Sequence, residues 1–178
     1  MRILHFHDSP KVLGGATKYL KQCLSHFNKS TYEHGVFSME ALEPFLLASN
    51  QFCYVYPWNS SFLARRTDFY KFYAPLAKSI EKTFEEFRPD LIHIHNWANF
   101  RSTFFNTILN SSIPSLMTVH DFSLNWKASP QRKGGLKGLV PDLINKRHHQ
   151  AATNSCKEAV DKFLCPTYAI RSGLDLPL

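Results

Sequence analysis

The chain has 178 residues, which is about the size of one ordinary globular domain. Hydrophobic residues make up 44% of it and charged residues 20%, a balance that supplies a packed core and excludes a disordered chain. The net charge of +7 favours an anionic partner such as a phosphorylated small molecule or an acidic membrane surface, and we expect no nucleic-acid partner because no nucleic-acid-binding motif is present.

Short apolar segments alternate with longer amphipathic segments along the first half of the chain. Three segments predict strands: residues 2–7, 36–39 and 52–56. After the first of them, apolar residues recur at helical spacing: Ala16, Tyr19, Leu20, Cys23, Leu24 and Phe27. A shorter helix is expected around residues 40–48, and Pro75 should split the helical pattern of residues 62–87 into two pieces.

The second half continues the alternation. Three more strands are predicted: residues 91–95, 114–119 and 166–170. A helix between the first two of these is indicated by one apolar face: Phe100, Phe104, Phe105, Ile108 and Leu109. A basic loop is expected at residues 127–138. Ser155 and Glu158 have the spacing of a capping box, which predicts that a helix begins there and carries Phe163 on its apolar face.

Alternation of strands and helices predicts parallel strands that are joined by right-handed crossovers. We therefore expect an α/β fold with a Rossmann-like, doubly wound, mainly parallel sheet that is flanked by helices. We expect residues 1–178 to form a single domain of this kind.

Polar residues and glycines follow three of the predicted strands, at the edge where open parallel sheets bind ligands. They form three groups: His7, Asp8, Gly14 and Gly15; His95, Asn96 and Trp97; His120 and Asp121. Because the carboxyl ends of parallel strands lie at one edge, the three groups are expected to meet in one site.

Gly14 and Gly15 stand directly before the first predicted helix. Two glycines allow the backbone to come close to a ligand, and the N–H groups at a helix start favour an anion such as phosphate. A flexible turn between strand and helix is the alternative. Gly-x-Gly-x-x-Gly and Walker A patterns are both missing from the sequence, which argues against ordinary dinucleotide or P-loop binding.

His120 with Asp121, and His95 with Asn96, are pairs that suit the recognition of substrate hydroxyls at a strand end. Capped turn residues at the end of a strand would have the same sequence pattern. Both readings stay open for these pairs.

Five histidines fall near this edge of the predicted sheet: His5, His7, His93, His95 and His120. His5 and His93 are expected to form hydrogen bonds inside the fold. The gathering also indicates a metal site, but ligand pairs at helical spacing and metallohydrolase signatures are missing from the sequence, and we expect no metal.

Five stretches of the chain carry a resemblance to a known family. They are residues 2–6 (RILHF) followed by 14–16 (GGA), 88–96 (RPDLIHIHN), 114–122 (PSLMTVHDF), 152–155 (ATNS) and 170–175 (IRSGLD). In their order and spacing these stretches resemble the retaining glycosyltransferases of family 4, which have the two-domain GT-B fold. The resemblance implies the amino-terminal, acceptor-side domain of an enzyme that moves a hexose from a nucleotide-sugar to a glycan or lipid-linked acceptor.

The resemblance also implies a role for each group of strand-end residues. The donor phosphates would be contacted by Gly14, Gly15 and Lys18. The catalytic pair would be His120 and Asp121, with His120 hydrogen-bonded to the transferred sugar. The acceptor side of the cleft would be lined by Asp8, His95, Asn96 and Trp97. No metal cofactor is implied, because a helix dipole and basic side chains stabilise the departing diphosphate.

Residues 171–178 resemble the start of the linker between the two GT-B domains, and the donor-binding domain is missing from the sequence. We therefore expect the isolated chain to be inactive without a carboxyl-terminal donor-binding domain. Two alternatives stay open: a non-catalytic α/β module that binds a nucleotide, a sugar or a partner, and a metal-dependent hydrolase.

The sequence predicts a cytoplasmic protein. Its four cysteines are scattered without a Cys-x-x-Cys pair, as expected for reduced thiols. A first strand at residue 2 leaves no room for a signal peptide, and no apolar run has the length of a transmembrane helix. The aromatic and basic residues 62–78 form either a helix packed on the sheet or a surface that faces the acceptor or an anionic membrane.

Overall fold

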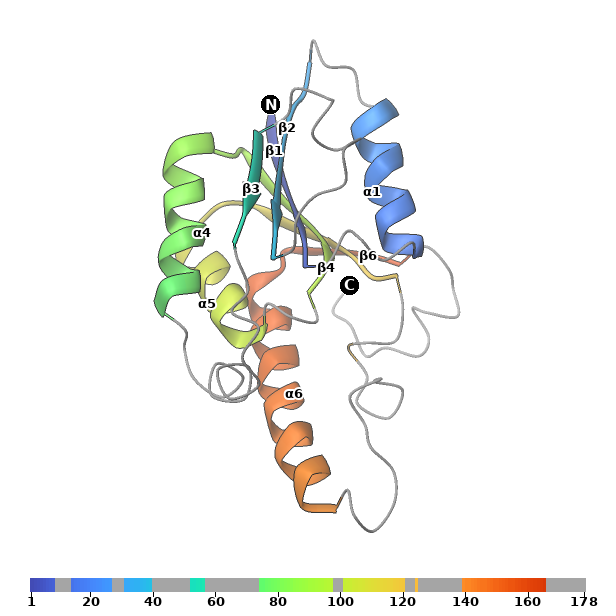
Figure 1. Ribbon diagram of the computed structural model, residues 1–178, viewed down its shortest axis with the longest axis vertical. Coiled ribbons are helices and arrows are strands. Elements are labelled where there is room, and N and C mark those ends of the chain that lie inside the picture. The colour runs from blue at the N-terminus through green and yellow to red at the C-terminus, as the bar shows by residue number, and fades with distance from the viewer. Residues whose placement is uncertain are drawn as a thin grey trace.

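A computed structural model describes most of the chain and shows a parallel sheet with helices on both faces (Figure 1). The described residues are 1–8, 14–26, 31–39, 52–56, 74–97, 101–120, 124 and 139–165. The six strands in this part are β1 (Arg2–His7), β2 (Glu33–Ser38), β3 (Phe52–Val55), β4 (Leu91–Asn96), β5 (Ser115–Thr118) and β6 (Lys162–Leu164). The four helices in it are α1 (Gly15–His26), α4 (Ala74–Phe87), α5 (Arg101–Ser111) and α6 (Leu139–Ala159).

The strand order is β3-β2-β1-β4-β5-β6, and every neighbouring pair is parallel. From β1 the chain moves outward to β2 and β3, and then returns to place β4 on the other side of β1. This is the strand order of the doubly wound dinucleotide-binding folds, and it opens a crevice at the carboxyl ends of β1 and β4. The predicted Rossmann-like α/β fold is confirmed.

One face of the sheet carries the main hydrophobic core, which packs against α4, α5 and α6 (Figure 1). Alternate residues of the central strands point into it, among them Phe6 of β1 and Ile94 of β4, which are completely buried. The Phe6 ring lies 5.1 Å from that of Phe37 and 4.7 Å from that of Phe104. These packed aromatic rings hold α5 on this face.

The opposite face is covered by α1 and is much more polar. Its apolar cluster consists of Leu20 and Leu24 of α1 with Val36 of β2, and Cys53 packs against it. The central strands also carry four buried histidines: His5, His34, His93 and His95. Because side chains alternate along a strand, the pattern that buries Leu4 and Phe6 in the main core places His5 under α1.

Several predicted helix details hold in the structure. α4 begins at Ala74, so Pro75 lies in its first turn, where a missing N–H costs no hydrogen bond. The predicted apolar face of α5 is correct for Phe104, Phe105 and Ile108 but wrong for Leu109, which is 48% exposed. The buried Thr103 and Thr107 move the centre of this face away from Leu109, and the Thr107 hydroxyl donates to the Thr103 carbonyl oxygen at 2.8 Å.

The prediction that a helix begins at Ser155 is wrong, since Ser155 and Glu158 lie in the last turns of α6. The capping-box spacing of three residues is also an ordinary spacing inside a helix. Phe163 lies in β6 and not on a helix. The turn between α6 and β6 is held by the Asp161 carboxylate, which accepts hydrogen bonds from the backbone N–H and the hydroxyl of Ser115 at 2.7 and 3.1 Å.

Other predictions fall on residues outside the described part. They are the helix at residues 40–48, the first piece of residues 62–87, the loop at 127–138, the strand at 166–170 and the linker at 171–178. Within the described residues, no helix combines the length and the apolar character needed to cross a bilayer.

Candidate functional site

A pocket of about 280 Å³ opens at the crevice between the carboxyl ends of β1, β4 and β5 and the start of α1. It lies where the strand order reverses, which is the usual ligand site of an open parallel sheet. Its lining comes from three segments: His7 with Gly14 to Thr17, His95 to Trp97, and Met117 to His120.

The pocket wall is fixed by the pairing of β1 with β4. Their register shifts between Phe6 and His7, so that His7 lies opposite Asn96. Just beyond the strands, the backbone N–H of Asp8 donates to the Asn96 carbonyl oxygen at 3.3 Å. These contacts bring the polar ends of both strands to the same level of the sheet.

The start of α1 forms the opposite wall. Gly14 and Gly15 line the pocket, and the first helical hydrogen bond runs from the Lys18 N–H to the Gly14 carbonyl oxygen at 3.1 Å. A Cβ atom placed on Gly15 would have no atom within 4 Å, so the backbone at this point lies open to a ligand. The first turn contains no acidic residue, and its N–H groups and helix dipole favour an anion.

Three buried polar atoms on residues that line the pocket have no hydrogen-bond partner among the described residues. They are His7 Nδ1, His95 Nδ1 and Trp97 Nε1. A buried polar atom without a partner is costly and rare in a folded protein. A polar ligand in the pocket would supply the missing partners.

His7 is neutral in this environment. Burial, with a smaller effect of nearby His120, lowers its pKa to about 4. The Asp8 carboxylate lies 4.0 Å from His7 Nδ1, which is beyond hydrogen-bond distance, so the two do not form a salt bridge at neutral pH. The second nitrogen, Nε2, is 3.3 Å from the Thr17 hydroxyl of α1.

Behind the pocket, the buried histidines form a connected row. His34 Nδ1 is 2.9 Å from His5 Nε2, and His5 Nδ1 is 2.9 Å from His95 Nε2. The expectation that His5 forms hydrogen bonds inside the fold is confirmed, and the same holds for His93, whose Nε2 is 2.8 Å from the Thr118 hydroxyl. The Tyr19 ring of α1 lies over the row, 5.7 Å from the ring of His95.

The structure brings six of the predicted site residues together around the pocket: Gly14, Gly15, His95, Asn96, Trp97 and His120. Lys18 is exposed on α1 and does not line the pocket. Asp8 is buried beside His7 without lining it. Asp121 lies outside the described residues.

Two polar lining residues were missed by the sequence analysis, Thr17 and Thr118. Thr17 stands two residues after Gly15, where its hydroxyl reaches His7, and Thr118 is the last residue of β5. Neither forms a motif, but both stand next to predicted groups at an expected ligand edge. His34 was also missed, although its alternation with Val36 would have placed it on the α1 face.

Sequence comparisons bear on what this pocket serves. No curated protein matches the chain in sequence. A family model, Glycosyltransferase Family 4, matches residues 13–174, which include most of the pocket residues. Together with the doubly wound sheet and the pocket at its switch point, this match shows that the chain belongs to Glycosyltransferase Family 4.

Proposed function

We propose that this chain is the amino-terminal, acceptor-side domain of a retaining hexosyltransferase, which uses a nucleotide-sugar donor and a glycan or lipid-linked acceptor. Family membership supports the transfer of a sugar. The observation that carries the assignment to this pocket is the set of unpartnered buried atoms, His7 Nδ1, His95 Nδ1 and Trp97 Nε1, beside the start of a helix.

The two walls of the pocket suit the two parts of a sugar diphosphate. Phosphate oxygens would accept hydrogen bonds from the N–H groups of the first turn of α1, next to Gly14 and Gly15. Sugar hydroxyls would bond to His95 and to His120, both of which line the opposite side. A neutral imidazole has one donor and one acceptor nitrogen, which matches a hydroxyl in either direction.

The proposed reaction breaks the bond between the anomeric carbon and the diphosphate, and forms a bond from that carbon to an acceptor oxygen on the same face. The acceptor proton leaves on the diphosphate. The positive, amino-terminal end of a helix dipole near the departing oxygens would stabilise the negative charge that develops there. Asn96 and His120 would hold the sugar in place, and Asp121, which follows His120 in the sequence, would assist at the same centre.

The size of the pocket supports the need for a second domain. About 280 Å³ is at or below the lower end of the range for small-molecule sites, roughly 300–1,000 Å³. It accommodates a sugar with part of the diphosphate and leaves the nucleoside outside. We propose that a carboxyl-terminal domain binds the nucleoside, so that this chain alone binds the donor weakly and does not turn it over.

Binding to nucleoside diphosphates and nucleotide-sugars tests the proposal, using calorimetry or ligand-observed NMR. The variant His120→Ala should weaken binding at least about tenfold, the effect of one hydrogen bond to a charged or oriented group. His26→Ala is the matched control, because His26 is exposed at the end of α1 opposite to the turn that lines the pocket. If no such ligand binds, or if both variants bind equally well, the proposed site is wrong.

A transfer assay separates the proposal from its alternative. The isolated chain should show no release of sugar from any donor, and the chain joined to a donor-binding domain should transfer it. Robust turnover by the isolated chain would overturn the two-domain part of the proposal. Binding that never leads to transfer, even in the joined protein, would favour a non-catalytic sugar- or nucleotide-binding module.

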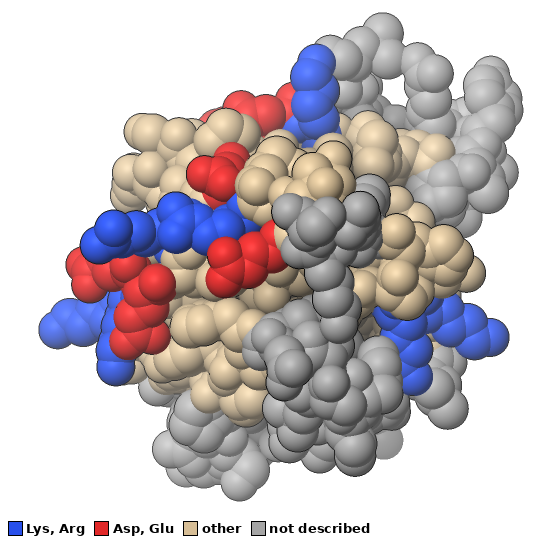
Figure 2. Space-filling model, turned by 90° about the horizontal axis from the view of Figure 1, so that it is seen from above, with Lys and Arg blue, Asp and Glu red and all other residues tan. Residues whose placement is uncertain are grey.

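We also propose a cytoplasmic location with peripheral contact to an anionic membrane, on the basis of the net charge of +7. On the face shown in Figure 2, acidic and basic groups are mixed at the left, and a separate group of basic side chains stands at the lower right. α4 exposes both acidic and basic side chains, and among them Lys82 pairs with Glu86 at 3.5 Å. Flotation with anionic and neutral vesicles tests the contact, and equal binding to both would contradict it.

A further inference from the structure

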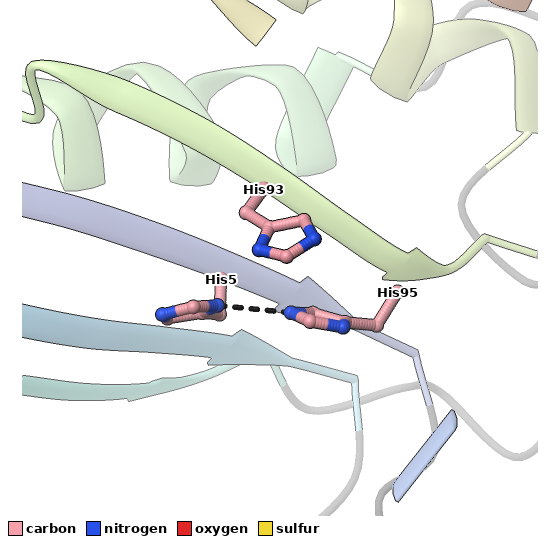
Figure 3. A group of neighbouring side chains, drawn as sticks. All are labelled: His5, His93 and His95. Atoms are coloured by element: carbon pink, nitrogen blue, oxygen red, sulfur yellow. Dashed lines mark hydrogen bonds between the residues drawn. The ribbon is translucent and has the colours of Figure 1, made fainter. Parts of the chain in front are cut away.

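The α1 face of the sheet brings three imidazoles to one point (Figure 3). His5 comes from β1, and His93 and His95 come from the neighbouring β4, where they are two residues apart and therefore on the same face. His5 lies directly opposite His93 in the strand register. All three side chains are buried, so their positions are set by the sheet itself.

The nitrogens are close enough to share one ion. One nitrogen from each ring lies within 4.8 Å of the other two, and His5 Nδ1 is 2.9 Å from His95 Nε2. Figure 3 shows the His93 ring over this contact, and its centroid is 4.0 Å from that of His95. Zinc–nitrogen bonds of about 2.0–2.1 Å in a tetrahedral site place two ligand nitrogens about 3.3 Å apart. His5 Nδ1 and His95 Nε2 are already close to this separation, and the His93 nitrogen, within 4.8 Å of both, would complete the set by a shift of its side chain.

The outer nitrogens of two rings are already held. His5 Nε2 is 2.9 Å from His34 Nδ1, and His93 Nε2 is 2.8 Å from the Thr118 hydroxyl. Histidines that bind metals usually have such a partner on the second nitrogen, because it fixes the tautomer and the ring orientation. The ligand atoms would then be Nδ1 of His5, Nδ1 of His93 and Nε2 of His95, and the ion would replace the hydrogen bond between His5 Nδ1 and His95 Nε2.

The protonation state also suits an ion. Burial, followed by the neighbouring histidines, lowers the pKa of His5 and His95 well below the usual value, and burial together with His120 lowers the pKa of His93 to about 4. Neutral imidazole is the form that binds metals, so no proton has to leave at neutral pH. His95 lines the pocket, which gives an ion a route from solvent.

We propose that His5, His93 and His95 bind one divalent transition-metal ion of the zinc class, joining β1 to β4 beneath the pocket. Zinc, copper and nickel bind imidazole nitrogens well, whereas magnesium and calcium bind oxygen ligands, so three imidazoles favour the first group. The ion would cross-link β1 and β4, the two strands between which the crevice opens. His95 belongs both to this site and to the pocket lining, but the proposed transfer reaction itself needs no metal.

The test uses purified protein that has been stripped with a chelator and then titrated with Zn²⁺ against a chromophoric chelator. One equivalent should bind, and Co²⁺ in its place should give the visible absorption of a site rich in nitrogen ligands. His93→Gln should weaken binding at least about 100-fold, since even the loss of an outer partner typically costs 10–100-fold. His34→Asn, which changes such an outer partner, should have a smaller effect.

The control is His26→Gln, because His26 is exposed on α1 and is not one of the three ligands. Circular dichroism verifies that each variant is folded, and His95→Asn replaces His93→Gln if the latter is not. Failure of the wild-type protein to bind Zn²⁺, or unchanged binding in the folded ligand variant, would overturn the proposal, and so would an equal loss of binding in His26→Gln. Nucleoside diphosphate binding by the stripped protein would leave the proposed function standing in either case.

Discussion

Acidification should unfold this domain well above the pH at which carboxylates titrate, because its central histidines are buried in the neutral form. His7 and His93 have pKa values of about 4 in the folded chain, against 6.5 for an ordinary histidine. Between these two values the unfolded chain binds more protons than the folded one. The stabilisation is therefore complete above pH 6.5 and is lost as the pH falls from 6.5 towards 4.

The size of this effect follows from the shifts. One pKa unit corresponds to about 1.4 kcal/mol, so His7 and His93 each remove about 2 kcal/mol between pH 7 and pH 5. Burial, followed by the neighbouring histidines, also lowers the pKa of His5 and His95 well below the usual value, so their protonation adds to the loss. The sum for His7 and His93, about 4 kcal/mol, is a large part of the whole stability of a typical domain, about 5–15 kcal/mol.

Urea unfolding followed by circular dichroism at several pH values, with a chelator present, measures this loss. The free energy of unfolding should fall steeply below pH 6.5, and His93→Gln should reduce the slope by about 1.4 kcal/mol per pH unit. His26→Gln, at an exposed position, should leave the slope as it is. A free energy that stays constant between pH 7 and pH 5 would refute the inference that these imidazoles are buried and neutral.

Three further predictions concern the packing around the sheet. Gly35→Ala should lower the free energy of unfolding by about 1–3 kcal/mol, because its Cβ would lie 3.1 Å from two core side chains, whereas Gly15→Ala meets nothing within 4 Å and should not show this loss in the same urea titration. Phe104→Ala should cost about 3–5 kcal/mol by leaving a cavity in the main core, and a loss below 1 kcal/mol would contradict the packing described. Cys156 should resist a thiol reagent in the native state and react after unfolding, since it is completely buried and burial raises its pKa; rapid native labelling, read by mass spectrometry, would contradict this.

The fold could be predicted from the sequence because each level of pattern agreed. Alternation of apolar residues identified the central strands, and Leu4 and Phe6 do face the main core. The failure at Ser155 has a physical cause: a capping box is defined by a spacing that a continuing helix also satisfies. Whether a helix begins at such a spacing or ends shortly after it depends on tertiary contacts. Here these are the hydrogen bonds from Ser115 to the Asp161 carboxylate, which join segments far apart in the sequence.

The candidate site could be predicted only in part, for a similar reason. Strand ends can be located along the chain, so residues such as His95 and His120 were found. The depth of each residue depends on strand register, which the sequence does not state. The register shift between Phe6 and His7 sets His7 opposite Asn96. His7, to which the sequence analysis gave no specific role, therefore lines the pocket.

The polar face beneath α1 has a consequence for how the molecule opens. α4, α5 and α6 are anchored by a continuous layer of aromatic and aliphatic side chains, whereas among the described residues the apolar cluster under α1 is small and consists of Leu20, Leu24, Val36 and Cys53. Regions with few buried apolar contacts open at the lowest free-energy cost. α1 is thus the described helix that should detach from the sheet most easily. An anion bound at its first turn would stabilise its position on the sheet.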